Sequence, residues 1–66
     1  MSDDWRGYVE TWCALNGLAA ESAVPWLMQQ PSGQQAKRQR SLGASDRVLS
    51  GLLHNAAIEA ELIKGI

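Results

Sequence analysis

The chain has few of the residues that form crosslinks or metal sites in small proteins or that act in enzyme active sites. It has one cysteine, Cys13, one histidine, His54, and no phenylalanine among its 66 residues. One cysteine excludes an intrachain disulfide, and one cysteine with one histidine cannot supply the ligands of a structural zinc site. A chain of this length buries barely enough apolar surface to offset the entropy of ordering it. We therefore expect a single domain over residues 1–66 that gains stability from a partner or from a second copy of itself.

Long hydrophobic runs are also absent. No stretch approaches the eighteen or so consecutive apolar residues that cross a bilayer. Residues 1–4 carry two acidic side chains where a secretory signal would be basic. Together with the lone thiol, these absences predict a cytoplasmic protein that makes no membrane contact.

The net charge of -1 conceals an uneven distribution. Residues 1–30 are net acidic, whereas residues 31–47 are net basic. A protein held by phosphate contacts usually carries a basic excess over the whole domain, so the overall charge argues against nucleic acid. A local basic surface within residues 31–47 remains compatible with it.

The apolar pattern of the first half predicts helix over about residues 3–30, capped by Ser2 or Asp3. The steps of three and four residues run through Trp5, Tyr8, Trp12, Leu15, Ala19, Ser22 and Trp26. Gly17 is a plausible helix end, because glycine readily adopts the left-handed conformation there. Pro25 fits the first turn of a second short helix that begins near Glu21 or Ser22. We therefore expect a break near Gly17.

Residues 31–44 form a polar, basic connection. Pro31 ends the preceding helix, and Ser32 with Gln35 forms a candidate capping box. A short helix over about residues 33–42, ending at Gly43, is one interpretation; a flexible loop is the other, because the segment has almost no apolar face.

The last segment, residues 45–64, is predicted to be a helix that Ser45 or Asp46 caps and Lys64 with Gly65 closes. Its apolar positions cover an arc wider than one neighbouring helix can bury: Val48, Leu49, Leu52, Leu53, Ala56, Ile58, Ala60, Leu62 and Ile63. We expect an all-α fold, a small helical hairpin or a three-to-four-helix unit. In it, the N-terminal helix would lie antiparallel to the C-terminal helix, and a homodimer would cover the remaining face.

The sequence holds no convergent set of catalytic groups. His54 and Cys13 fall on different helices, and the acidic pairs at residues 3–4 and 59–61 suit helix ends and opposite helix faces. The six glycines are dispersed, so no phosphate-binding loop is present. These features predict a protein that is not an enzyme and needs no cofactor, metal or small-molecule substrate.

The aromatic and leucine residues are the first candidate site, for another protein. Tryptophan and tyrosine bring large area at low entropic cost, and a short chain cannot easily enclose all of them. Such a protein would be a regulator, adaptor or inhibitor that occludes a partner surface. A role in the protein's own core is the competing interpretation, which applies most to the residues in the middle of the stripe. The candidate contacts are Trp5, Tyr8, Trp12, Trp26, Leu49 and Leu53, with Trp5 and Trp26 the strongest.

The basic connection is the second candidate site, for DNA. Glutamine and arginine read adenine and guanine edges bidentately, and residues 34–40 can follow residues 19–30 as the second helix of a dimeric helix-turn-helix. In a rival register Gly17 lies in the turn, but Pro25 then interrupts the reading helix. A merely solvated surface is the third interpretation. The candidate DNA contacts are Gln34, Gln35, Lys37, Arg38 and Arg40.

Overall fold

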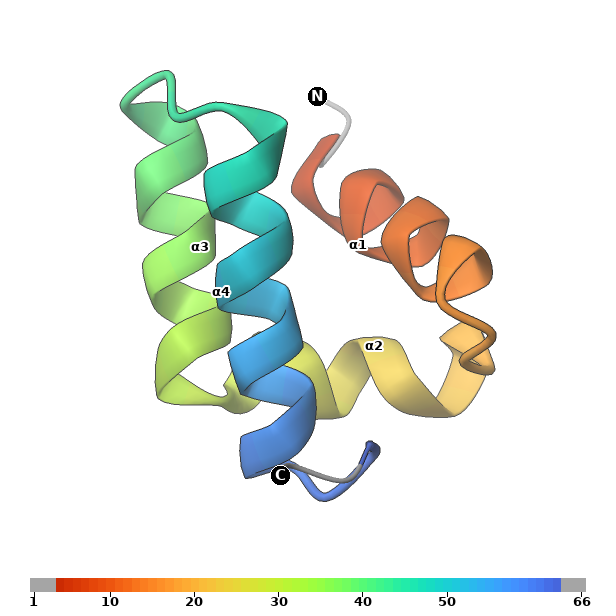
Figure 1. The fold of residues 1–66 in the computed structure, drawn as a ribbon. Coiled ribbons are helices and arrows are strands. Elements are labelled where there is room, and N and C mark those ends of the chain that lie inside the picture. Colours follow the sequence, from red (N-terminus) through yellow and green to blue (C-terminus); the bar gives the residue numbers. More distant parts are fainter. Residues whose placement is uncertain (1–3, 64–66) are drawn as a thin grey trace.

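The computed structural model describes residues 4–63, and within that range the chain is helical without strands, which confirms the all-α prediction. The helices are α1 (Asp4–Leu15), α2 (Ala20–Gln29), α3 (Pro31–Ser41) and α4 (Asp46–Glu59). Figure 1 shows α3 and α4 side by side in opposite directions, with α2 across the lower end of the pair and α1 above α2. The predicted caps at residues 2–3 lie outside the described range.

The pairing of α4 differs from the prediction. Its most extensive contact is with α3, not with the N-terminal half of the chain. The Tyr8 hydroxyl of α1 reaches Asp46, and the Trp12 indole reaches Ser50, four residues further along both helices. Contacts that advance together along two helices show that α1 runs in the same sense as α4. The predicted antiparallel pairing of the N-terminal and C-terminal helices is therefore not what the structure shows.

The antiparallel neighbour of α4 is α3, and the buried residues of α3 are small rather than large and apolar. Gly33 and Ala36 are its buried positions, and they allow its backbone to approach its neighbours closely. The predicted capping box is absent, because the helix begins at Pro31 and the Ser32 hydroxyl instead donates to Glu59 Oε2 of α4 over 2.7 Å. The segment is thus an ordered helix and not a loop.

Two glycines end helices as predicted. After α1, Gly17 has φ +72°, the Leu18 amide donates to the Cys13 carbonyl over 2.8 Å, and the Gly17 amide donates to Ala14. After α3, Gly43 has φ +87° with the equivalent pair of bonds. Both ends are Schellman motifs, which need a left-handed residue at that position. The predicted break near Gly17 and the predicted end at Gly43 are confirmed.

Helix α2 begins earlier than predicted. It starts at Ala20, so Pro25 lies in its second turn rather than its first. Proline has no amide hydrogen, so the Glu21 carbonyl lacks its usual helical donor. Glu21 and Pro25 are both exposed, and water can satisfy that carbonyl.

Helix α4 begins as predicted and ends early. The Ser45 side chain accepts from the Val48 amide at its start. It ends at Glu59 and closes with another Schellman pattern, in which Glu61 adopts φ 60°. The predicted end at Lys64 and Gly65 is therefore wrong, and those two residues lie outside the described range. A strained left-handed glutamate, which propensity does not favour, ends the helix instead.

Glu61→Gly is expected to stabilise the protein by about 0.5–1 kcal/mol, because glycine adopts a positive φ without the steric cost that glutamate meets. Urea denaturation followed by circular dichroism measures the change. Glu61→Gln is the matched control: it removes the charge and keeps the strain, so it should leave the unfolding free energy nearly unchanged. An equal gain in both variants would attribute the effect to charge.

The core is built from all four helices. In the described range its buried apolar residues are Trp5, Val9, Trp12, Cys13, Ala23, Val24, Leu27, Ala36, Leu49, Leu53, Ala56 and Ala57. No helix among residues 4–63 combines the length and the apolarity that a membrane span requires. The cytoplasmic location stays a prediction.

Candidate functional site

A groove of about 640 Å³ separates α1 from α4 on one face of the molecule. One end lies at the N-terminal turns of both helices and is charged, and the other lies at the C-terminal turn of α1. We call it the α1–α4 groove. Its lining residues are Asp4, Gly7, Tyr8, Thr11, Trp12, Leu15, Asn16, Arg40, Asp46 and Ser50.

The charged end is organised around Tyr8. Its ring stacks on Trp5 with centroids 5.7 Å apart, and the Arg40 guanidinium lies 5.3 Å from its ring centroid. The Tyr8 hydroxyl donates to Asp46 Oδ1 over 3.1 Å, and Arg40 lies 3.7 Å from an Asp4 carboxylate oxygen. Three helices therefore meet at one aromatic ring that has a cation on its face and carboxylates nearby.

The pKa of Tyr8 is raised above its ordinary value of 10.0, first by burial, then by its hydrogen bond to Asp46 and that residue's negative charge; Arg40 lowers it in part. Asp46→Asn is therefore expected to lower this pKa, and Arg40→Gln to raise it. Tyr8 is the sole tyrosine, so tyrosinate absorbance during an alkaline titration reports it directly. The folded state favours the neutral form of Tyr8, so this residue contributes its full stabilisation below the pKa of tyrosine in the unfolded chain, about 10. The contribution is lost as the pH rises above about 10 and through the raised pKa of the folded state. An unchanged Tyr8 pKa in Asp46→Asn would contradict the hydrogen bond.

A hydrogen bond crosses the middle of the groove. The Trp12 indole donates to Ser50 Oγ over 3.0 Å, which joins α1 to α4 there. Gly7 has no side chain, and a Cβ at that position would meet nothing within 4 Å. At the far end Leu15 is 81% exposed. The groove thus passes from carboxylates to hydroxyls to an unpartnered leucine.

Four of the six predicted protein contacts lie in the core: Trp5, Trp12, Leu49 and Leu53. Trp5 is 4% exposed, although its place near the chain end suggested a thinner core. The reason is tertiary: α3 and α4 return over the start of α1, and Tyr8 stacks on the indole. These four residues do not offer a partner the exposed area that the prediction required. The prediction that they contact a partner is therefore corrected: they belong to the protein's own core.

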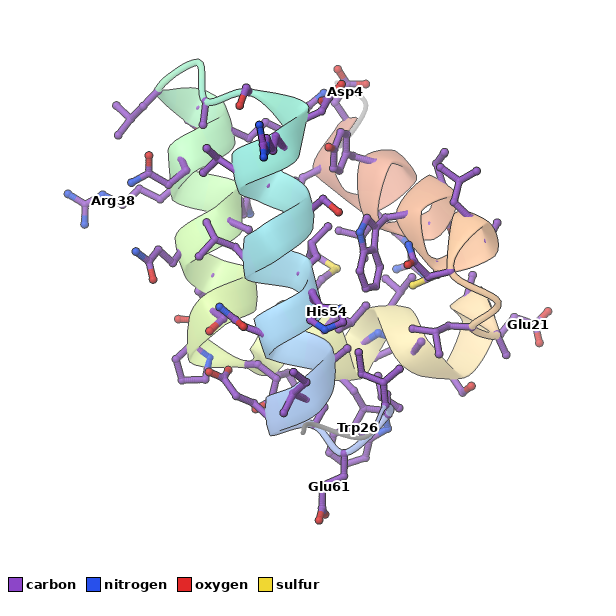
Figure 2. The ribbon with its side chains drawn as sticks, in the orientation of Figure 1. Asp4, Glu21, Trp26, Arg38, His54 and Glu61 are labelled. Carbon is purple, nitrogen blue, oxygen red and sulfur yellow. The ribbon has the colours of Figure 1, made fainter. Side chains whose placement is uncertain are left out.

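The other two predicted contacts are accessible. Tyr8 is half-buried in the groove, and Trp26 is 54% exposed. Trp26, labelled in Figure 2, belongs to α2 and is not among the residues that line the groove. The sequence stripe that joined these aromatic residues is therefore divided between two faces, because the turn after Gly17 redirects α2.

The predicted DNA contacts are also divided. Gln34, Gln35, Lys37 and Arg38 are exposed on α3, and Arg38 points away from the bundle in Figure 2. Arg40 instead faces α1, where it contacts Tyr8 and Asp4. Residues two apart on a helix point in different directions, so Arg38 and Arg40 serve two different surfaces.

The predicted helix-turn-helix geometry is not found. A single residue, Gln30, separates α2 from α3, whereas the motif has a turn of three to four residues. In the rival register α2 would be the reading helix, but Pro25 lies inside it and its charged residue is Glu21. Neither pair of helices reproduces the predicted motif.

The remaining reactive groups do not form a site. Cys13 is fully buried, and burial, followed by the charge of Glu10, raises the pKa of its thiol. His54 lies exposed on α4 (Figure 2). Within residues 4–63 no three histidine, cysteine or acidic side chains come together in a way that would hold a metal ion.

Sequence reasoning missed the groove. From sequence, Asp46 is interpreted as a helix cap, Leu15 as part of the apolar stripe and Arg40 as a DNA contact. The contacts between α1 and α4 join residues 38 apart, and such a separation gives no periodic signal in the sequence.

Comparisons with protein-family models, with curated proteins and with solved structures find no match for this chain.

Proposed function

We propose that this protein is a small non-enzymatic protein-binding module that acts as a regulator, adaptor or inhibitor by occluding a partner surface. The observation that carries the proposal is Leu15, which is 81% exposed at the end of a groove that residues 4–63 leave open. A large apolar side chain in a concave surface is typical of a binding site.

The energetics favour binding at this groove. Burying a leucine contributes about 1.5–3 kcal/mol, and Leu15 lines the groove with most of its surface exposed. Thr11 and Asn16 donate to carbonyls of α1, and Ser50 accepts from Trp12. Asn16 Oδ1 can still accept a hydrogen bond from a peptide in the groove, and the Ser50 hydroxyl can still donate one. Occlusion needs shape and area alone, so it makes no demand for a catalytic group.

Crosslinked capture from the source cells tests the proposal with a matched pair of variants. Leu15→Glu is expected to lose the captured protein, because a carboxylate replaces the apolar anchor. Leu42→Glu makes the same change at a residue that is 72% exposed and follows the end of α3, outside the groove, and it should capture as the wild type does. Equal capture by all three proteins would reject the groove as the binding site.

Duplex DNA is the second candidate, and one observation favours it. Lys37 and Arg38 are exposed beside Gln34 and Gln35, and among residues 4–63 neither cation forms an ion pair. By contrast, Arg6 lies 3.7 Å from Glu10, and Arg40 is paired with Asp4. Helix α3 therefore presents positive charge that no acidic side chain within the described residues pairs with.

A mobility shift on random duplex at low salt tests this second candidate. Replacing Lys37 and Arg38 by alanine should weaken binding and reduce the log-log salt slope by about one for each lost phosphate contact. Arg6→Ala is the control, since that cation is already paired. The absence of a wild-type shift removes the candidate.

We also propose that the chain forms a homodimer through α4. Val48 is 49% exposed on that helix, and Leu52 beside it is half-buried. Sedimentation equilibrium should give twice the chain mass of 7.2 kDa, and Val48→Glu should return it to the chain mass. A constant mass of one chain at every concentration would reject the dimer.

A further inference from the structure

The charged end of the α1–α4 groove has an excess of negative charge. Asp4 and Asp46 both line it, and Arg40 is the one cation among the described lining residues. Arg40 is engaged with Asp4. Asp46 accepts a hydrogen bond from Tyr8, but no cation lies within ion-pair distance of it among residues 4–63. Among residues 4–63, one carboxylate at the end of the groove therefore remains without a positive partner.

The same end already shows that it accommodates a cation. The Arg40 guanidinium lies over the Tyr8 ring at 5.3 Å and reaches a carboxylate at 3.7 Å. An aromatic face combined with a carboxylate is the environment that attracts lysine and arginine side chains. Asp46 accepts a hydrogen bond from the hydroxyl of that same ring, so its carboxylate is a second negative group at this end of the groove.

The opposite end offers a different contact. Leu15 is seven residues after Tyr8 on α1, and Tyr8 is the residue that contacts Asp46, so the two contacts lie about 10 Å apart along the helix at 1.5 Å per residue. Three extended residues or two helical turns cover that length. An occupant of the groove therefore needs a positive group at one end and an apolar side chain at the other.

We infer that the α1–α4 groove binds a peptide segment of a partner protein that places a lysine or arginine beside Asp46 and a large apolar side chain beside Leu15. The inference rests on the proposed protein-binding function and specifies the chemistry of the partner. An acidic segment or a nucleic acid would bring negative charge to two carboxylates, which is unfavourable.

Selection of a phage-displayed library of random 16-residue peptides on the full-length protein tests the inference. Enriched peptides should combine lysine or arginine with a large apolar residue. A synthetic enriched peptide should bind about tenfold more weakly to Asp46→Lys and to Leu15→Glu, measured by fluorescence anisotropy at low salt. Arg40→Gln should bind it more tightly, because the competing internal cation is gone.

Glu21→Lys is the matched control for charge. It makes the same change at an exposed carboxylate on α2, outside the groove, and should alter the affinity by no more than about twofold. Circular dichroism checks that each variant folds. Asp46→Asn and Asp4→Asn, which add no new charge, serve if the lysine variant does not fold.

The possible outcomes distinguish a failure of this inference from a failure of the proposed protein-binding function. Peptides that are acidic, or that need Leu15 but bind equally well after either change at Asp46, would overturn the inference and leave the groove as a protein-binding site. A library that yields no peptide sensitive to Leu15→Glu would overturn both.

Discussion

Gly33→Ala is expected to unfold the protein or to bring it close to unfolding. A Cβ at Gly33 would lie far inside contact distance of the Leu27 carbonyl oxygen and carbon. Both groups belong to backbone, and Gln30 alone separates α2 from α3, so neither helix can move away freely. Overpacking a core costs about 1–3 kcal/mol and more where backbone must shift, whereas a small domain has about 3–5 kcal/mol in total.

Gly51→Ala is the control for this substitution. Gly51 is exposed in the middle of α4, and a Cβ there would meet nothing within 4 Å. Alanine should therefore stabilise the protein by about 1 kcal/mol through helix propensity alone. Thermal unfolding followed at 222 nm measures both variants. If Gly33→Ala were as stable as the wild type, the close approach of α3 to the end of α2 would be wrong.

Leu53→Ala is expected to cost about 2–5 kcal/mol, the second large effect. Leu53 is fully buried in the middle of α4, in the cluster that also contains Leu27 and Leu49. Removing its side chain loses transfer free energy and leaves a cavity that the surrounding helices cannot fill completely. Urea denaturation measures the loss. Labelling of the buried Cys13 thiol offers an independent measurement, because it should accelerate as the folded state opens more often.

Leu42→Ala makes the same chemical change where the leucine is 72% exposed. Its cost should stay below about 0.5 kcal/mol, since little buried area is lost. Similar losses at both positions would contradict the assignment of Leu53 to the core and of Leu42 to the surface.

The sequence by itself determined the helical class and most helix ends. Gly17, Gly43 and Ser45 act through their own backbone conformation or through bonds to residues within one turn. Such signals are local, so they can be read without knowing the fold. Where the local preference is weak, the prediction failed: α4 ends at Glu59, although no glycine follows until Gly65.

Tertiary structure alone decided which helices pair and which side chains remain exposed. α3 has almost no apolar face in sequence, yet it packs beside α4, and its buried positions are the small residues Gly33, which lies against the end of α2, and Ala36. Trp5 is enclosed and Leu15 is left open because α3 and α4 return over the start of α1 and not over its end. The groove joins residues 38 apart, a relation that no periodicity encodes. Its existence therefore depends on how four short helices share one core.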